Sequence, residues 1–185
     1  AIRSILDQTY EDFEFIIIDD GSTDKTINVI GHFNDRRLVV LDNEENIGLT
    51  RSLNKGLEIA QGKLIARMDA NDIALETRFE KQVAVFQNNE DVDLVWTGAV
   101  YITEDGEYLC PKLAPTFQDA IDLLLSCPTN FPVGRNHINH PSVIFKKRAV
   151  TRLGGYSEKY KWGQDGNLWC RMLKGGARFH FLEEP

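Results

Sequence analysis

The sequence predicts an α/β domain with a mostly parallel central sheet and helices on both faces. Up to about residue 100, short apolar runs typical of strands alternate with segments whose apolar residues recur at helical spacing. Two of the apolar runs, 13–19 and 63–68, lead directly into clusters of acidic residues. Because ligands of open α/β sheets bind at the carboxyl ends of the strands, both clusters are expected at one crevice.

The elements up to residue 102 alternate in a regular order. They are a helix over 1–8, a strand over 13–19, a helix from about Asp24, a strand over 38–41, a loop over 43–48, a helix over 49–60, a strand over 63–68, a helix around 79–86 and a strand over 94–102. Ser22-Thr23-Asp24 offers N-cap side chains for the second helix.

The chain opens inside the first of these helices, with Ile2, Ile5 and Leu6 on one face. A parallel α/β unit normally places a strand before such a helix. We therefore expect an N-terminally truncated domain whose first strand is missing from this sequence.

The part after residue 102 is less regular. Glu104-Asp105-Gly106 is a hairpin turn signal, and Gly175-Gly176 marks a helix end. The expected elements are a strand over 107–109, loops over 111–140 around one helix at about 117–126, a strand over 142–145, a helix over 167–174 and a strand over 177–182. We expect all of 1–185 to form one domain.

Size and composition exclude several classes of protein. With 185 residues, 42% of them hydrophobic, the chain suits a globular domain with a real core. No apolar run approaches the ~20 residues of a membrane span. The net charge of −7 argues against nucleic-acid binding, which relies on a basic face. Cys110, Cys127 and Cys170 form no CxxC pair, which favours reduced thiols in a cytoplasmic protein.

The acidic clusters indicate the chemistry of the ligand. Asp69-Ala70-Asn71-Asp72 places three oxygen-bearing side chains at one strand end, and Asp19-Asp20-Gly21-Ser22 follows the earlier strand. Mg²⁺ and Mn²⁺ prefer such oxygen ligands and leave positions open for phosphate oxygens. The clusters therefore predict a phosphate-bearing ligand with a divalent metal. No G-x-G-x-x-G, P-loop or G-x-S-x-G motif supports another α/β enzyme class.

At the level of motifs, the chain resembles family 2 glycosyltransferases of the GT-A fold, of the bacterial type. The resemblance covers essentially the whole chain and rests on an ordered series of motifs at consistent spacing. The series is Ser4-Ile-Leu-Asp-Gln-Thr-Tyr10, Ile16-Ile-Ile-Asp-Asp-Gly-Ser-Thr-Asp24, Asn46-Ile-Gly48, Ala66-Arg-Met-Asp-Ala-Asn-Asp72, Arg78-Phe-Glu-Lys-Gln82, His140-Pro-Ser142, Gly154-Gly-Tyr156, and Gln164-Asp165 with Leu168-Trp169.

The resemblance implies a metal-dependent, inverting hexosyltransferase that moves a sugar from a nucleotide-diphosphate sugar to an acceptor hydroxyl. Residues 1–102 would form the nucleotide-sugar-binding half and 103–185 the acceptor-side half. The implied donor is a UDP-sugar, the metal Mn²⁺ or Mg²⁺, and the acceptor a saccharide or lipid-linked saccharide. The implied setting is cell-surface polysaccharide biosynthesis in the cytoplasm, at the inner face of the plasma membrane, with peripheral membrane association.

The resemblance also implies roles for individual residues. These are Asp165 as the catalytic base; Asp19, Asp20, Arg51 and Asp69 as nucleotide-sugar contacts; Asp69, Asn71 and Asp72 as metal ligands; and His140 and Gln164 as acceptor-side residues. Asp165 precedes a predicted helix, whose N-terminal dipole would favour a charged, base-competent carboxylate.

Two positions depart from the family pattern. Asn71 stands where the family usually has Asp, so a metal would lose one formal charge among its ligands, although Asp72 could compensate. Gln164 stands where Glu is common, which alters the surroundings of Asp165. Two functions therefore stay open: a glycosyltransferase, and a weakened or non-catalytic nucleotide-sugar-binding module of the same fold.

Taken singly, each site residue also has an ordinary structural explanation. The two acidic clusters fit polar turns, and Asp165 fits a helix N-cap. Arg51 fits a solvated helix face, and His140 fits a loop or core position. Trp162 and Trp169 fit the hydrophobic core. Their joint occurrence in one ordered series favours function.

Overall fold

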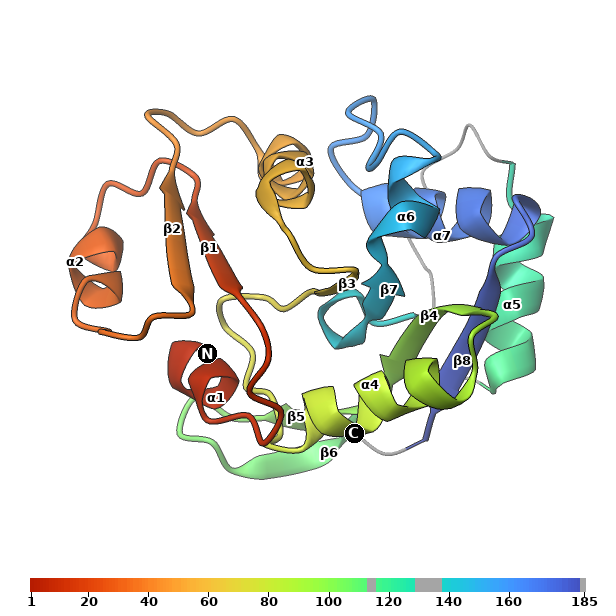
Figure 1. Cartoon of the computed structure of the whole chain (residues 1–185), viewed down its shortest axis with the longest axis horizontal. Coiled ribbons are helices and arrows are strands. Elements are labelled where there is room, and N and C mark those ends of the chain that lie inside the picture. The colour runs from red at the N-terminus through yellow and green to blue at the C-terminus, as the bar shows by residue number, and fades with distance from the viewer. Residues whose placement is uncertain (113–115, 129–137, 184–185) are drawn as a thin grey trace.

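The computed structural model describes residues 1–112, 116–128 and 138–183. It confirms an α/β fold in which strands and helices largely follow the predicted order (Figure 1). The elements are α1 (Ile2–Leu6), β1 (Phe15–Asp19), α2 (Thr26–Ile30), β2 (Leu38–Asp42), α3 (Leu49–Ile59), β3 (Leu64–Ala66), α4 (Arg78–Asn88), β4 (Val92–Thr97), β5 (Ala99–Ile102), β6 (Tyr108–Lys112), α5 (Phe117–Ser126), the 3₁₀ turn η1 (His140–Ser142), β7 (Ile144–Lys146), α6 (Lys147–Thr151), α7 (Gln164–Lys174) and β8 (Arg178–Leu182).

The strands form three groups. The central sheet has the order β3-β7-β4-β8, in which β4 and β8 are parallel and β7 runs antiparallel to both of its neighbours. β1 and β2 form a parallel pair, and β5 and β6 form an antiparallel hairpin. In Figure 1 the β1–β2 pair and the central sheet lie on opposite sides of the molecule, with α3 between them.

Helices cover both faces of the central sheet, because successive side chains of a strand point to opposite faces. Leu94 and Trp96 of β4 belong to a core cluster with apolar residues of α5 and α7. Val95, between them, belongs to a second cluster with Phe79 and Phe86 of α4. The predicted layering of helices on both faces is therefore confirmed.

One predicted strand, 94–102, is wrong as a single element. The chain leaves the central sheet after Thr97, whose ladder partner Leu182 ends β8. It continues beyond Gly98 as β5, which pairs with β6 in the separate hairpin. A glycine inside a strand pattern is a common place for such a break, because it has no side chain to pack.

Two other predicted strands are shorter than expected. The strand predicted over 63–68 ends at Ala66, although the Arg67 amide still donates to the Val143 carbonyl at 3.1 Å. The strand predicted over 142–145 begins at Ile144, because Ser142 belongs to η1, where its amide bonds back to Asn139.

The loop region expected over 111–140 contains the predicted helix as α5, and 113–115 and 129–137 lie outside the described residues. Among the described residues, no helix combines the length and apolar character needed to cross a bilayer.

Candidate active site

Asp20, just after β1, shapes the loop that leads into α3. Its carboxylate accepts hydrogen bonds from the amides of Ile47 and Gly48 at 3.1 and 2.9 Å. It also accepts from Asn43 Nδ2 and Ser52 Oγ, each at 2.9 Å. Partial burial alone would raise the pKa of Asp20, but these hydrogen bonds outweigh burial and lower it. The carboxylate is therefore held charged and almost fully hydrogen-bonded by the protein itself.

Asp19 and Gly21 complete this turn. The buried Asp19 carboxylate accepts from the amide of Ser22 at 3.0 Å and from its hydroxyl. At Gly21, which has φ +74°, a Cβ atom would lie 2.7 Å from the backbone of both Glu45 and Asn46. The turn after β1 and the loop after β2 thus meet backbone to backbone, which requires glycine at this position.

The loop after β3 carries the second acidic cluster. Buried Arg67 forms an ion pair with Asp69, whose side chain is 42% exposed. Asn71 is exposed and Asp72 is half-buried. Burial lowers the pKa of Arg78 to about 10, with Asp72 close enough to oppose that shift. The loop therefore carries carboxylate and amide oxygens that solvent can reach, next to the two buried guanidinium groups of Arg67 and Arg78.

Arg78 and Gln82, one turn apart on α4, support this loop from inside the protein. Arg78 Nε donates to Gln82 Oε1 at 3.0 Å, and Arg78 Nη2 donates to the Arg67 carbonyl at 2.9 Å. Gln82 Nε2 donates in turn to backbone carbonyls of β4 and η1. The pair therefore donates hydrogen bonds to backbone carbonyls just after β3, in β4 and just before β7. These bonds fix the start of the acidic loop.

Asp165 lies in the first turn of α7, which confirms that it stands at the start of a helix. The helix begins three residues before its predicted start. Asp165 is half-buried, whereas the side chain of Gln164 is 6% exposed. Asp165 is therefore the acidic group of this helix end that solvent can reach.

His140 and Tyr156 form a buried pair in this part of the protein. His140 Nε2 and Tyr156 Oη lie 2.9 Å apart. Burial holds the pKa of His140 well below its usual value, and the charge of Arg67 acts in the same direction. Burial raises the pKa of Tyr156, on which the charges of both Arg67 and Asp165 also act. A neutral imidazole and a neutral phenol thus lie within reach of the Arg67 charge, and the phenol also lies within reach of the Asp165 charge.

Helix α3 links the two parts of the site. Its Ser52 reaches Asp20 on the β1 side, and its Asn54 reaches the backbone of Tyr156 on the other side. Arg51 forms an ion pair with Glu158 at 3.2 Å, with both side chains more than half exposed. Both predicted acceptor-side residues, His140 and Gln164, are buried, so they lie beneath the surface of the site.

The oxygen donors Asp69, Asn71 and Asp72 have the chemistry that Mg²⁺ and Mn²⁺ prefer. Among the described residues, however, no three His, Cys, Asp or Glu side chains gather as a metal-binding group. The protein atoms therefore fit part of a coordination sphere, which phosphate oxygens of a ligand would have to complete.

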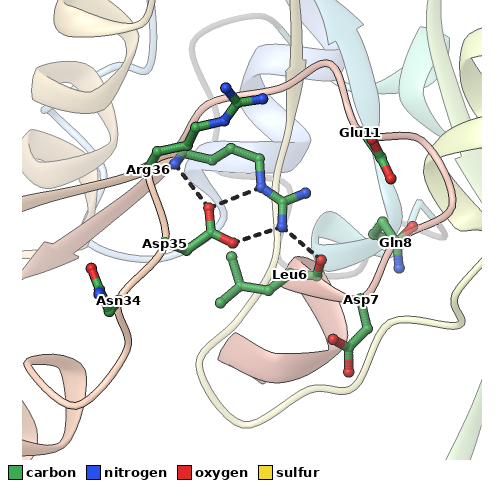
Figure 2. Close-up of a pocket in the computed structure, with 8 residues that line it drawn as sticks. Leu6, Asp7, Gln8, Glu11, Asn34, Asp35 and Arg36 are labelled. Carbon is green, nitrogen blue, oxygen red and sulfur yellow. Dashed lines mark hydrogen bonds and ion pairs between the residues drawn. The ribbon is translucent and has the colours of Figure 1, made fainter.

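A hollow of about 510 Å³ lies elsewhere, between the end of α1 and the residues before β2. Figure 2 shows Asp35 and the carbonyl of Leu6, which both accept hydrogen bonds from Arg37 at 2.8 Å. Arg37 precedes β2, so the hollow lies at the amino ends of β1 and β2, whereas Asp19 ends β1. The hollow is therefore separate from the acidic clusters.

Several side chains that hold the site together have no role in the sequence prediction. The Arg78–Gln82 spacing on the buried side of an amphipathic helix is a signal that could have found that pair, since buried charged groups need partners. Tyr156 and Arg67 belong to motifs of the series. Asn54 carries no local signal, because a polar residue in a helix is ordinary and its partner is 102 residues away.

Comparison with known proteins identifies the family of this chain. The family model described as "Glycosyl transferase family 2" matches residues 1–145. An uncharacterized glycosyltransferase of Methanocaldococcus jannaschii is 34% identical over 100% of this chain and 62% of its own length. The Escherichia coli UDP-Gal:alpha-D-GlcNAc-diphosphoundecaprenol beta-1,3-galactosyltransferase is 30% identical over 96% of this chain and 62% of its own length. The chain thus spans less than two thirds of these relatives.

A solved structure shares the fold. The Pyrobaculum calidifontis mannosyltransferase PcManGT, in complex with GDP-Man and Mn²⁺, superposes with a TM-score of 0.68 at 18% identity. The match covers 98% of this chain and 49% of that one. With the predicted GT-A fold supported by this neighbour and the family model matched over most of the chain, the protein belongs to glycosyl transferase family 2.

Proposed function

We propose that this chain transfers a sugar from a UDP-sugar to a hydroxyl of a saccharide or lipid-linked saccharide, with inversion at the anomeric carbon. The observation that carries the proposal is that the charges of Arg67, which is paired with Asp69, and of Asp165 both act on Tyr156 of the buried His140–Tyr156 pair, so both parts of the proposed site lie near one residue. A donor-binding loop and a general base must meet in this way for a direct displacement.

The residue roles follow the chemistry of that displacement. The acceptor oxygen attacks the anomeric carbon while the bond from that carbon to the diphosphate breaks, and the diphosphate leaves with the electron pair. Asp165 takes the acceptor proton, which typically contributes ~10²–10⁴-fold to the rate. Bound Mn²⁺ or Mg²⁺ would neutralise charge on the departing diphosphate. Asp69, Asn71 and Asp72 would hold the metal, and Arg51 would contact the donor.

We assign the first acidic cluster to the nucleotide. Since protein donors already occupy the Asp20 carboxylate, Asp20 would act by fixing the loop over 43–48 that faces the nucleotide, with Asp19 holding the adjoining turn. Because His140 and Gln164 are buried, we assign them support of Asp165 on the acceptor side rather than direct acceptor contact.

The choice of donor and acceptor rests on a relative. The 30% identical Escherichia coli galactosyltransferase is named for UDP-Gal and a diphosphoundecaprenol-linked acceptor. A UDP-sugar and a lipid-linked saccharide are therefore the first candidates, with the reaction at the cytoplasmic membrane face and peripheral membrane association for polysaccharide assembly.

Calorimetric titration of UDP and GDP, each with and without Mn²⁺, tests this function. Metal-dependent binding of one nucleotide supports the transferase and identifies the donor class. If the folded protein binds neither nucleotide, the proposed function is wrong.

A second candidate is a weakened or non-catalytic relative that binds nucleotide sugars. Asn71 favours it, since an amide brings no formal charge to the metal. The Arg67–Asp69 ion pair favours it too, because a metal must compete with Arg67 for that carboxylate. Nucleotide binding without any sugar transfer would select this candidate.

A further inference from the structure

The turn at residues 153–156, called here the bridging turn, is held between two helices. From α3, Asn54 Nδ2 donates to the Tyr156 carbonyl and Asn54 Oδ1 accepts from the Tyr156 amide, both at 2.9 Å. From α7, Arg171 donates to the carbonyls of Leu153 and Gly155 at 2.9 and 2.7 Å. The bridging turn therefore ties α3 to the helix that begins beside Asp165.

The fit between α3 and the bridging turn is close. A Cβ atom on Gly155 would lie 2.7 Å from Asn54 Oδ1, and Gly155 has φ +75°. Two other polar contacts of α3 with this region are weaker: the Thr50 hydroxyl reaches the Tyr160 carbonyl at 3.2 Å, and the Arg51 ion pair is exposed. Asn54, which satisfies both backbone groups of one residue, is thus the principal polar attachment, beside the apolar packing of Leu53 and Leu57 in the same core cluster.

The bridging turn also reaches into the site. The Tyr156 hydroxyl is bonded to His140, whose ring packs edge-on against Trp169 at 5.7 Å. Trp169 lies one helical turn after Asp165 on α7, so both residues occupy the same helix face. A displacement of Tyr156 would therefore be transmitted to the part of α7 that carries Asp165.

We propose that Asn54 is a positioning residue, which acts through the bridging turn and Tyr156 to hold Asp165 at a fixed place relative to the donor side. The inference rests on the proposed function, since it takes Asp165 as the base. Displacement of a general base by about 1 Å can cost on the order of 10²-fold in rate without weakening donor binding. Loss of Asn54 should therefore act on kcat and not on the KM for the donor.

The test compares the full chain with Asn54→Ala, with Tyr156→Phe, and with Asn89→Ala as a matched control at the exposed end of α4. Tyr156→Phe removes a single hydroxyl, so the proposal can still be tested if Asn54→Ala does not fold. Turnover is measured as UDP release from UDP-glucose, UDP-galactose and UDP-N-acetylglucosamine with Mn²⁺ and a diphospholipid-linked N-acetylglucosamine as the acceptor, and UDP binding by calorimetry.

We expect Asn54→Ala and Tyr156→Phe to lower kcat about tenfold or more, with donor KM and UDP affinity within about twofold of the native values. Asn89→Ala should match the native chain. The proposal is overturned if both site variants keep native kcat, or if kcat, KM and melting temperature deteriorate together, as a general loss of structure would cause.

A second readout does not depend on turnover. In protein labelled with 5-fluorotryptophan, Asn54→Ala should shift or broaden the ¹⁹F resonance of Trp169, which Asn54 reaches through Tyr156 and His140. The resonance of Trp96, which stacks on Phe117 and Phe181, should stay in place. An unchanged Trp169 resonance contradicts the bridge. If Asn54→Ala shifts the Trp169 resonance but the native chain shows no turnover, the bridge is supported and the result counts against the proposed function.

Discussion

Tyr156 Oη lies 2.9 Å from His140 Nε2 inside the core, where the His140 ring also packs against Trp169 of α7. Because burial holds the pKa of His140 well below 6.5, the folded protein keeps this imidazole neutral at pH values where the unfolded chain protonates it. The unfolded state then binds more protons, so the free energy of unfolding falls as pH drops below about 6.5.

The first prediction concerns this pH dependence. Between pH 7 and 5, His140 should remove up to about 1.4 kcal/mol of stability per pH unit, measured by urea unfolding. His140→Gln keeps a hydrogen-bonding side chain that does not titrate, so its stability should fall less steeply. His32→Gln, which changes an exposed histidine just after α2, is the control for replacing a histidine. Equal slopes in all three proteins would show that His140 is protonated in the fold.

The second prediction concerns the backbone contact at Gly21. Gly21→Ala adds a Cβ that meets the backbone of Glu45 and Asn46, and it should cost about 3 kcal/mol or more. Gly106 also has a positive φ but nothing within 4 Å of a Cβ, so Gly106→Ala should cost about 1–2 kcal/mol. Thermal unfolding checks the difference, which should vanish if the two loops do not touch.

The third prediction concerns Asn71. If the proposed metal role is right, Asn71→Asp adds a charged ligand and should tighten Mn²⁺ binding in the presence of UDP about tenfold. Asn89→Asp, at the exposed end of α4, is the control for added charge alone. Calorimetry of Mn²⁺ into the UDP-saturated protein measures the change. No change relative to that control would remove Asn71 from the metal site.

Local patterns predicted much of this fold, and the errors have physical causes. Helix α5 lies at the predicted residues 117–126, because its apolar spacing and its Thr116 cap are local features. The antiparallel direction of β7 was not predictable from its three residues, because an apolar run carries no information on its partner. The break at Gly98 was not predictable either, because it depends on the different strands with which β4 and β5 pair.

The site was predictable as a set of motifs, but not as a set of contacts. The sequence placed Asp69 and Asp165 in one family pattern, and the charges of Asp165 and of Arg67, the partner of Asp69, both act on Tyr156. It did not predict that Asp20 is bound by four protein groups, or that Asn54 binds Tyr156. Those contacts join segments far apart in the chain, so no spacing rule could find them.

The last prediction is the central one, that Asp165 is the base of a sugar transfer. Asp165→Asn keeps the size of the side chain but cannot accept a proton at neutral pH. The most direct measurement is UDP release from the donor that the native chain uses, together with UDP affinity. We expect Asp165→Asn to lose ~10²–10⁴-fold in kcat with UDP affinity unchanged. Native turnover in Asp165→Asn would contradict it.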